Sequence, residues 1–92
     1  MEIDLGSVVC SKAGRDKGKF FFVVALEQEY AYLVDGDTRK ADRPKKKKLK
    51  HLQKTNYISD FISEKLRTIG KVTNSEVRKA LAEYSERQGA VV

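Results

Sequence analysis

The spacing of apolar and polar residues divides the chain into two halves with different periods. In the first half, short apolar runs alternate with polar turns, at Ser7–Ser11, 20–26 and Tyr30–Val34. Runs of this length, rich in β-branched and aromatic residues, predict strands. The polar residues 27–29 and the Asp-Gly pair at 35–36 predict the turns that join them. The pattern therefore predicts antiparallel strands at close spacing.

A lysine-rich stretch follows these three strands. We expect residues 45–54 to form one final strand, whose lysines face solvent and protect a sheet edge from aggregation. Pro44 has no backbone donor, so the chain around it is predicted to be a loop or an edge. Several short strands in succession predict a small antiparallel barrel. The alternation along the first strand does not decide which side chains point inward. They are either Val8 and Cys10 or Val9 and Ser11.

The second half follows the period of a helix. Ser59 is the predicted N-cap of a first helix, and Gly70 is its predicted stop. Thr73 and Glu76 fit a capping box, which predicts the start of a second helix. The apolar residues of the two helix faces are Ile58, Phe61, Ile62, Leu66 and Ile69 in the first, and Val77, Ala80, Leu81 and Tyr84 in the second. We therefore expect a mainly β domain at residues 1–54 and a C-terminal helical appendage at residues 55–92.

Length and charge narrow the class of protein. The 92 residues suffice for one compact domain with an appendage, and 40% hydrophobic with 35% charged residues allow a modest core under a charged surface. The net charge is +6, but residues 39–54 alone contain nine basic residues and one acidic residue, a net charge of +8. The cationic character is therefore local. It favours an anionic partner such as RNA, DNA or an anionic membrane surface.

Several classes of function are disfavoured by what the sequence lacks. One cysteine, Cys10, forms no intrachain disulfide, and with one histidine it makes no self-contained zinc site, so we expect no metal or cofactor. No nucleophile or paired carboxylate accompanies His51 at a spacing typical of catalysis, so we expect no enzyme and no small-molecule substrate. No apolar run is long enough to span a bilayer, and residues 1–4, with Glu2 and Asp4, are too acidic and polar for a signal peptide. We expect a cytoplasmic protein without a membrane partner.

The loop between the first two strands carries the strongest chemical signal. Gly14 and Gly18 supply the positive φ angles that tight turns need. Exposed backbone amides together with side-chain cations suit a phosphate group. The cations of the loop are Lys12, Arg15, Lys17 and Lys19. The ordinary alternative is a hairpin connection whose charges serve solubility, with Asp16 ordering the loop rather than binding a metal ion.

A second group of cations lies in the lysine-rich stretch. Pro44 stiffens its entry, and Leu49 and Leu52 anchor its exit to a core, which favours a binding surface over a merely solvated charge run. Flexible lysines act as point charges, so they give salt-sensitive affinity rather than a choice of sequence. The candidate RNA-binding residues here are Arg39, Lys40, Arg43, Lys45, Lys46, Lys47, Lys48 and Lys50, with His51 as a packing or phosphate-contact residue.

Aromatic residues offer a different means of binding RNA, because bases of single strands stack on them. We expect the three phenylalanines at 20–22 to supply core, and Tyr84 to lie on the apolar face of the second helix. Tyr30 and Tyr32 are the remaining candidates for an exposed stacking surface.

The glycine loop and its flanks resemble a known motif. Residues 6–19, read as GSVVCSKAGRDKGK and followed by an apolar strand, resemble the KOW motif of ribosomal proteins and transcription elongation factors. The continuation through residues 32–36, 42–47 and 49–52 is similar to the small bacterial KOW-domain RNA-binding proteins that resemble the fourteen-e family of large-subunit ribosomal proteins. The likeness covers about residues 5–54.

This resemblance implies an SH3-like barrel that contacts structured RNA. It implies that Gly14 and Gly18 are the loop glycines, that the neighbouring lysines and arginine are the loop cations, and that residues 43–45 face RNA. The helical part, from about residue 58 onward, departs from the bare KOW module.

These observations predict a non-enzymatic, ribosome-associated RNA-binding protein that grips ribosomal RNA by its phosphates, with ribosomal proteins as further partners. The 14–19 loop and the 39–50 segment are expected to converge on one face. KOW barrels also resemble docking adaptors of the transcription and translation machinery, which would use the apolar helix faces and exposed tyrosines. The helix pair also fits a DNA-binding helix-turn-helix. The mixed charge of the second helix suits a major groove poorly, so packing of the pair on the barrel or on itself is preferred.

Overall fold

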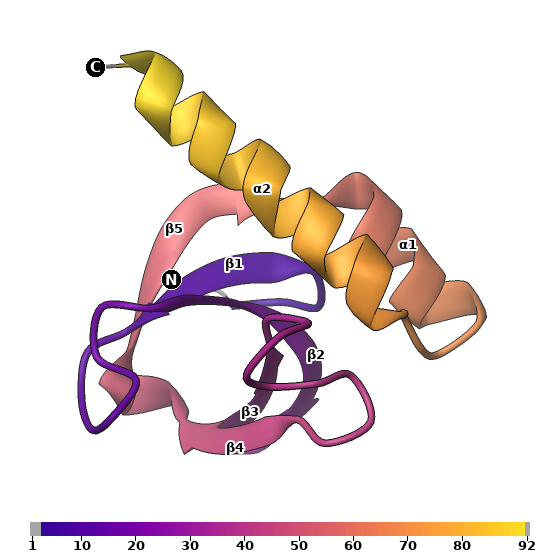
Figure 1. The fold of residues 1–92 in the computed structure, drawn as a ribbon. Helices are drawn as coiled ribbons and strands as arrows, with labels where there is room; N and C mark the ends of the chain where they lie inside the picture. The colour runs from indigo at the N-terminus through magenta and orange to yellow at the C-terminus, as the bar shows by residue number, and fades with distance from the viewer. Residues whose placement is uncertain (1–2, 92) are drawn as a thin grey trace.

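Five antiparallel strands form one strongly curved sheet, and two helices follow it in the chain (Figure 1). The computed structural model describes residues 3–91. The strands are β1 (Ser7–Ser11), β2 (Phe20–Glu27), β3 (Tyr30–Val34), β4 (Lys45–Lys48) and β5 (Leu52–Ile58), and the helices are α1 (Asp60–Thr68) and α2 (Asn74–Val91). Along the sheet the strand order is β4-β3-β2-β1-β5. The prediction of a mainly β protein with C-terminal helices is confirmed.

The lysine-rich stretch differs from its prediction, because residues 45–54 do not form one strand. A single turn of 3-10 helix at Leu49–His51 separates β4 from β5. β4 pairs with β3, whereas β5 pairs with β1 on the other side of the sheet, so the chain has to cross between the two edges. The strand β5 also continues to Ile58, which was expected to begin the helical pattern. It therefore runs past the predicted domain boundary at residue 54.

The sheet is open in the part of the chain that the structure describes. Its two edges are β4 and β5, and no ladder of hydrogen bonds joins them within residues 3–91. The curvature brings the sheet well around toward itself (Figure 1), but the closed barrel expected from the sequence is not formed by strand pairing.

The sheet buries apolar side chains on both of its faces. The concave face holds an inner cluster of Val9, Phe21, Val23, Ala31, Leu33 and Leu52. The convex face, under the helices, holds an outer cluster of Val8, Phe22, Val34, Ile62, Leu66, Val72, Val77, Ala80 and Tyr84. Val8 and Val9 are both fully buried, on opposite faces, which is why alternation could not choose between them. Phe20 is an exception to the expected core, since 42% of it is exposed.

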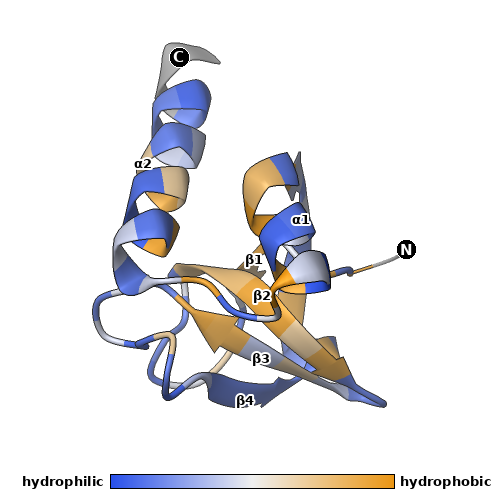
Figure 2. Cartoon of the chain, turned by 90° about the vertical axis from the view of Figure 1, so that its right-hand side faces the viewer, coloured by the Kyte–Doolittle hydropathy of each residue, from blue (hydrophilic) through white to orange (hydrophobic). Residues whose placement is uncertain are grey.

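The helix caps formed as predicted. The Ser59 side chain accepts a hydrogen bond from the backbone N–H of Ile62 at 3.2 Å, and Gly70 ends the helical turn with a φ of +90°. Thr73 and Glu76 exchange the two reciprocal hydrogen bonds of a capping box, at 2.9 and 3.1 Å. Both helices then pack on the outer cluster (Figure 2). This agrees with the expectation that the helix pair packs on the sheet, which was preferred to a DNA-binding helix-turn-helix.

Candidate nucleic-acid interface

The glycine loop connects β1 to β2 and contains both predicted turn glycines. Gly14 has a φ of +79° and Gly18 a φ of +88°, as tight turns require. Three backbone amides of the loop are used internally: Lys17 donates to Gly14, Gly18 to Ser11 and Lys19 to Asp16, at 3.2, 2.8 and 2.9 Å. The expectation that the loop presents its amides to a ligand is therefore wrong for these three groups. An anion at this loop meets mainly its side-chain cations.

A partly buried ion pair joins the glycine loop to the loop between β3 and β4. The Arg39 guanidinium donates to the Asp16 carboxylate at 2.8 Å, and Asp16 is only 5% exposed. This hydrogen bond lowers the pKa of Asp16 below its ordinary value of 3.8, against the opposing effect of burial. Asp16 therefore orders its loop, as expected. Arg39 was predicted to contact RNA, but its guanidinium is occupied in holding two loops together.

Two further hydrogen bonds tie the glycine loop to the lysine-rich stretch. Lys47 donates from Nζ to the carbonyl oxygen of Ala13 at 2.7 Å, and the backbone N–H of Lys12 donates to the carbonyl oxygen of His51 at 2.8 Å. Both Lys47 and His51 are half-buried. The two cationic segments, distant in the sequence, are thus brought side by side.

The loop that carries Arg39 is ordered by Asp35, a residue expected from the sequence only to mark a turn. Its carboxylate accepts hydrogen bonds from the backbone N–H groups of Asp37 and Arg39 and from the Thr38 hydroxyl, at 2.9, 2.7 and 2.7 Å. Burial disfavours the charged carboxylate, but these hydrogen bonds outweigh it and lower the pKa of Asp35. An Asp followed by Gly, Asp and Thr is a typical sequence signal for such a side-chain-stabilised turn.

The four lysines of β4 do not share one face of the sheet. Lys45 lies opposite Leu33 and Lys47 opposite Ala31, and both of these partners belong to the inner cluster. Because side chains alternate along a strand, Lys45 and Lys47 lie on the concave face, where Lys47 reaches the glycine loop. The predicted convergence on one face therefore applies to this pair and not to the whole lysine run.

The other two lysines lie on the convex face beside a pair of tyrosines. Lys46 is opposite Tyr32, and Lys48 is opposite Tyr30. The Lys46 amino group is 4.5 Å from the ring centroid of Tyr30 and 3.6 Å from the Glu27 carboxylate. The Tyr32 hydroxyl donates to the same carboxylate at 2.6 Å, which raises the pKa of Tyr32 and lowers that of Glu27.

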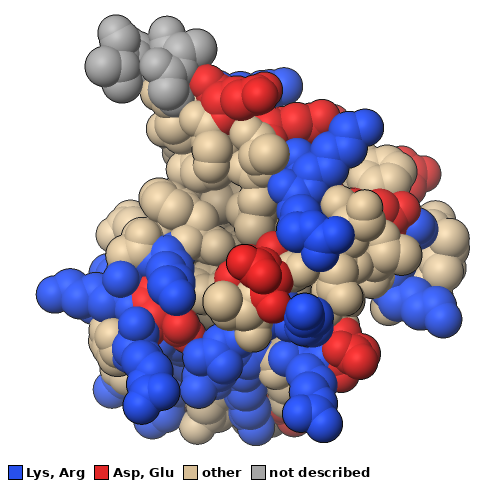
Figure 3. Space-filling view, viewed as in Figure 1, with Lys and Arg blue, Asp and Glu red and all other residues tan. Residues whose placement is uncertain are grey.

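Most of the predicted RNA-binding cations are exposed. In Figure 3 lysine and arginine side chains gather over the lower part of the molecule, whereas acidic and basic groups alternate over the helices. Arg39, Lys47 and His51 are half-buried. The exposed predicted cations are Lys12, Arg15, Lys17, Lys19, Lys40, Arg43, Lys45, Lys46, Lys48 and Lys50.

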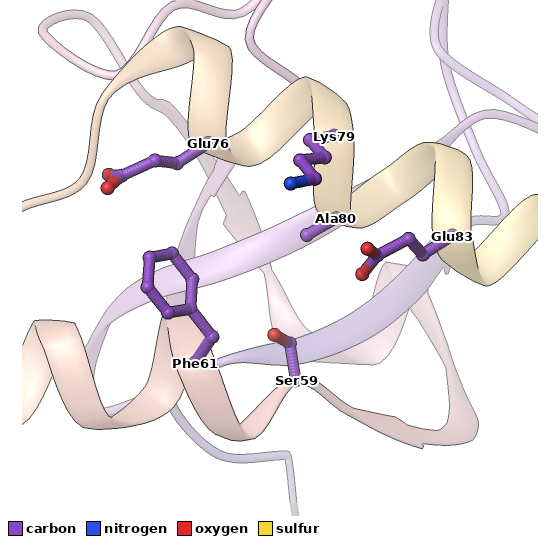
Figure 4. Close-up of a pocket in the computed structure, with 6 residues that line it drawn as sticks. All are labelled: Ser59, Phe61, Glu76, Lys79, Ala80 and Glu83. Atoms are coloured by element: carbon purple, nitrogen blue, oxygen red, sulfur yellow. The ribbon is translucent and has the colours of Figure 1, made fainter.

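A second surface lies between the two helices. A groove of about 260 Å³ is lined by residues from both helices, including Phe61, which reaches toward α2 from α1 (Figure 4). Phe61 is 58% exposed, and Ile69, the residue that follows α1, is 63% exposed. The predicted apolar face of α1 is therefore wider than the face that the sheet buries.

No family model matches this sequence, and no curated protein matches it either. Among the described residues, no group of three or more His, Cys, Asp or Glu side chains is arranged to hold a metal ion. Neither helix, over the part of the chain that the structure describes, is long and apolar enough to cross a membrane.

Proposed function

We propose that this protein is a non-enzymatic RNA-binding protein of the cytoplasm that associates with the ribosome and grips structured ribosomal RNA by its phosphates. The observation that carries the proposal is the joining of two cationic segments by Lys47–Ala13, Lys12–His51 and Arg39–Asp16 contacts. These contacts hold the glycine loop, which carries the exposed cations Arg15 and Lys17, against the segment that contains Lys45.

An SH3-like fold of the KOW type is part of this proposal. Five antiparallel strands in a strongly curved sheet support it, and so does the resemblance of residues 5–54 to KOW-domain RNA-binding proteins. The glycine loop then lies between β1 and β2, at the position of the motif.

The chemistry of the surface favours backbone contacts over reading of bases. Lysine ammonium groups are point charges on flexible stems, so they attract phosphates of any sequence. If about six phosphates are neutralised, the logarithm of the binding constant should fall with the logarithm of salt concentration at a slope of about −4 to −5.

A pair of matched double variants tests the proposal. Lys17→Glu with Lys45→Glu reverses two exposed cations of the joined segments, and Lys71→Glu with Lys79→Glu reverses two exposed lysines of the helical part. Both variants have the same net charge. We expect the first to weaken binding to a ribosomal RNA fragment and to make the salt slope less steep by about 1.5 to 2, because two phosphate contacts are lost. Equal effects of the two variants would contradict a localised RNA surface.

A second candidate function is protein docking in the transcription or translation machinery. The exposed Phe61 and Ile69 favour it, because they line one hollow on the surface of α1 and a contiguous exposed apolar surface marks an interaction site. Affinity purification with and without ribonuclease separates the two functions. Partners that survive digestion and are lost with Phe61→Ser support docking, whereas partners lost on digestion support RNA binding.

A further inference from the structure

The convex face of β3 and β4 carries two tyrosines that the phosphate contacts proposed above do not use. Tyr30 and Tyr32 are two residues apart in one strand, so they lie on the same face of the sheet. Lys48 and Lys46 stand directly opposite them in β4. Within the described residues, neither tyrosine belongs to the inner or the outer apolar cluster. In Figure 2, β3 and β4 extend below the two helices, beyond the part of the sheet that the helices cover.

Both tyrosines are half-buried, and an exposed lysine side chain, that of Lys46, lies over the Tyr30 ring. The Lys46 amino group is 4.5 Å from the centroid of the Tyr30 ring and 6.0 Å from that of Tyr32, and the lysine side chain is 49% exposed. A flexible, solvent-exposed cation is easily displaced from a ring, because its contact with the ring is weak at an exposed site. Another flat or cationic group can therefore take its place on the ring.

One of the rings is also held in a fixed orientation. The Tyr32 hydroxyl donates to Glu27 at 2.6 Å, from the neighbouring strand β2. A ring that is already oriented loses little conformational freedom when a second ring stacks on it. Glu27 is 57% exposed in its side chain and negatively charged, so the site favours a neutral ring over the carboxylates of an acidic peptide.

We propose that Tyr30 and Tyr32 form a stacking site for the base of an unpaired RNA nucleotide, with Lys48 beside its phosphate. This inference rests on the proposed RNA-binding function and specifies which part of the RNA binds to the convex face. Every base has a flat π-face, so the site accepts any base in a loop, bulge or single strand. Paired bases within a helix are already stacked and are excluded.

The test separates base stacking from phosphate binding by using two ligands of equal charge. The first is a short single-stranded oligoadenylate, and the second is a strand of the same length whose nucleotides are abasic. The protein variants are Tyr30→Ala with Tyr32→Ala, and Tyr30→Phe with Tyr32→Phe as the matched control that keeps both rings. We expect the alanine pair to lose about tenfold or more in affinity for oligoadenylate and to keep its affinity for the abasic strand. The phenylalanine pair should bind both ligands nearly as the unmodified protein does.

The outcomes distinguish failure of the stacking site from failure of the proposed RNA-binding function. If the unmodified protein binds both strands equally, phosphate binding stands and the stacking site is refuted. If it binds neither strand nor ribosomal RNA, the proposed function and this inference fail together. If polyglutamate competes for the site as well as oligoadenylate does, the convex face is a peptide surface and the inference is wrong.

A measurement on the unmodified protein covers the case in which the alanine pair fails to fold. Stacked rings shift one another's proton resonances, so adding oligoadenylate should shift the ring protons of Tyr30 and Tyr32 upfield. The ring protons of Tyr84, which is buried between α2 and the sheet, should stay in place. Unshifted Tyr30 and Tyr32 resonances at saturating oligoadenylate would overturn the proposal.

Discussion

Arg78 of α2 donates a hydrogen bond from Nη1 to the carbonyl oxygen of Gly36 at 2.7 Å, joining the second helix to the loop between β3 and β4. The first residue of the same helix adds a second contact, since the Asn74 side chain accepts from the backbone N–H of Ala41 at 2.7 Å. The helix therefore holds the loop that contains Arg39. In this way the helical part and the cationic surface form one structural unit.

Replacing Arg78 should loosen that loop. In Arg78→Ala the loop loses a charge-assisted hydrogen bond worth about 1 kcal/mol at a partly exposed site. We expect the backbone amides of Asp35 and Gly36, which both donate to the carbonyl oxygen of Arg39, to exchange hydrogen about fivefold faster. Lys79→Ala, on an exposed residue of the same helix, is the control. Unchanged amide hydrogen exchange in Arg78→Ala would show that the Asn74 contact alone is sufficient to hold the loop.

Two glycines of similar backbone conformation should tolerate a methyl group differently. Gly18 has a φ of +88° with open space around the position of a Cβ atom, so Gly18→Ala should cost about 1–2 kcal/mol for the backbone alone. Gly36 has a φ of +78°, and an added Cβ would lie 2.5 Å from the carbonyl oxygen of Asn74. We expect Gly36→Ala to be more destabilising by about 1–3 kcal/mol in urea unfolding. Equal losses of unfolding free energy in the two variants would mean that α2 shifts freely away from the loop.

The Asp16–Arg39 pair should make stability depend on acid pH. The pKa of Asp16 is lower in the folded protein than its ordinary value of 3.8, so the unfolded chain binds the proton more tightly. The stabilisation is therefore complete above about pH 5 and is lost as the pH falls through the folded-state pKa.

We expect Asp16→Asn to lower the free energy of unfolding by about 2–3 kcal/mol at pH 7, because it leaves the half-buried Arg39 guanidinium without its counter-charge. The difference from the unmodified protein should shrink toward pH 3. Asp42→Asn, at an exposed carboxylate of the loop that carries Arg39, is the control. A difference that stays constant with pH would contradict the ion pair as its origin.

Tyr32 should ionise at unusually high pH. Its hydroxyl donates to the Glu27 carboxylate, and this hydrogen bond raises the pKa of Tyr32 above its ordinary value of 10.0. Glu27→Gln keeps an acceptor oxygen but removes the negative charge, so the pKa of Tyr32 should fall back toward 10.0. A titration of the tyrosine ring resonances measures the change, and Glu29→Gln in the same turn serves as control. A Tyr32 pKa that is identical in both variants would exclude the Glu27 contact in solution.

The sequence predicted β1, β2, β3 and both helix caps because each has a local cause. Strand length, β-branched content and capping chemistry act over a few residues, and tertiary packing did not override them. The division of residues 45–54 has no such signal, since the 3-10 turn at Leu49–His51 contains neither glycine nor proline. It follows from the need to reach both edges of the sheet, which is a property of the whole fold.

The candidate site was predictable in its composition but not in the use of each cation. The positive φ angles of Gly14 and Gly18 follow from the loop chemistry, and the structure agrees. Which cations hold the loops together and which stay exposed depends on partners distant in sequence. Arg39 meets Asp16, and Lys47 meets Ala13, through contacts that span 23 and 34 residues. No local pattern distinguishes these two residues from their neighbours.

The double-sided burial of β1 and β2 has a consequence for any attempt to isolate the five-stranded sheet without the helices. Val8 and Phe22 are covered by side chains of α1 and α2, so cutting the chain after β5 would expose an apolar layer to water. Such a fragment should aggregate or unfold rather than remain a stable folded domain. The helices are thus the second half of the hydrophobic interior, and the smallest autonomous folding unit extends into α2.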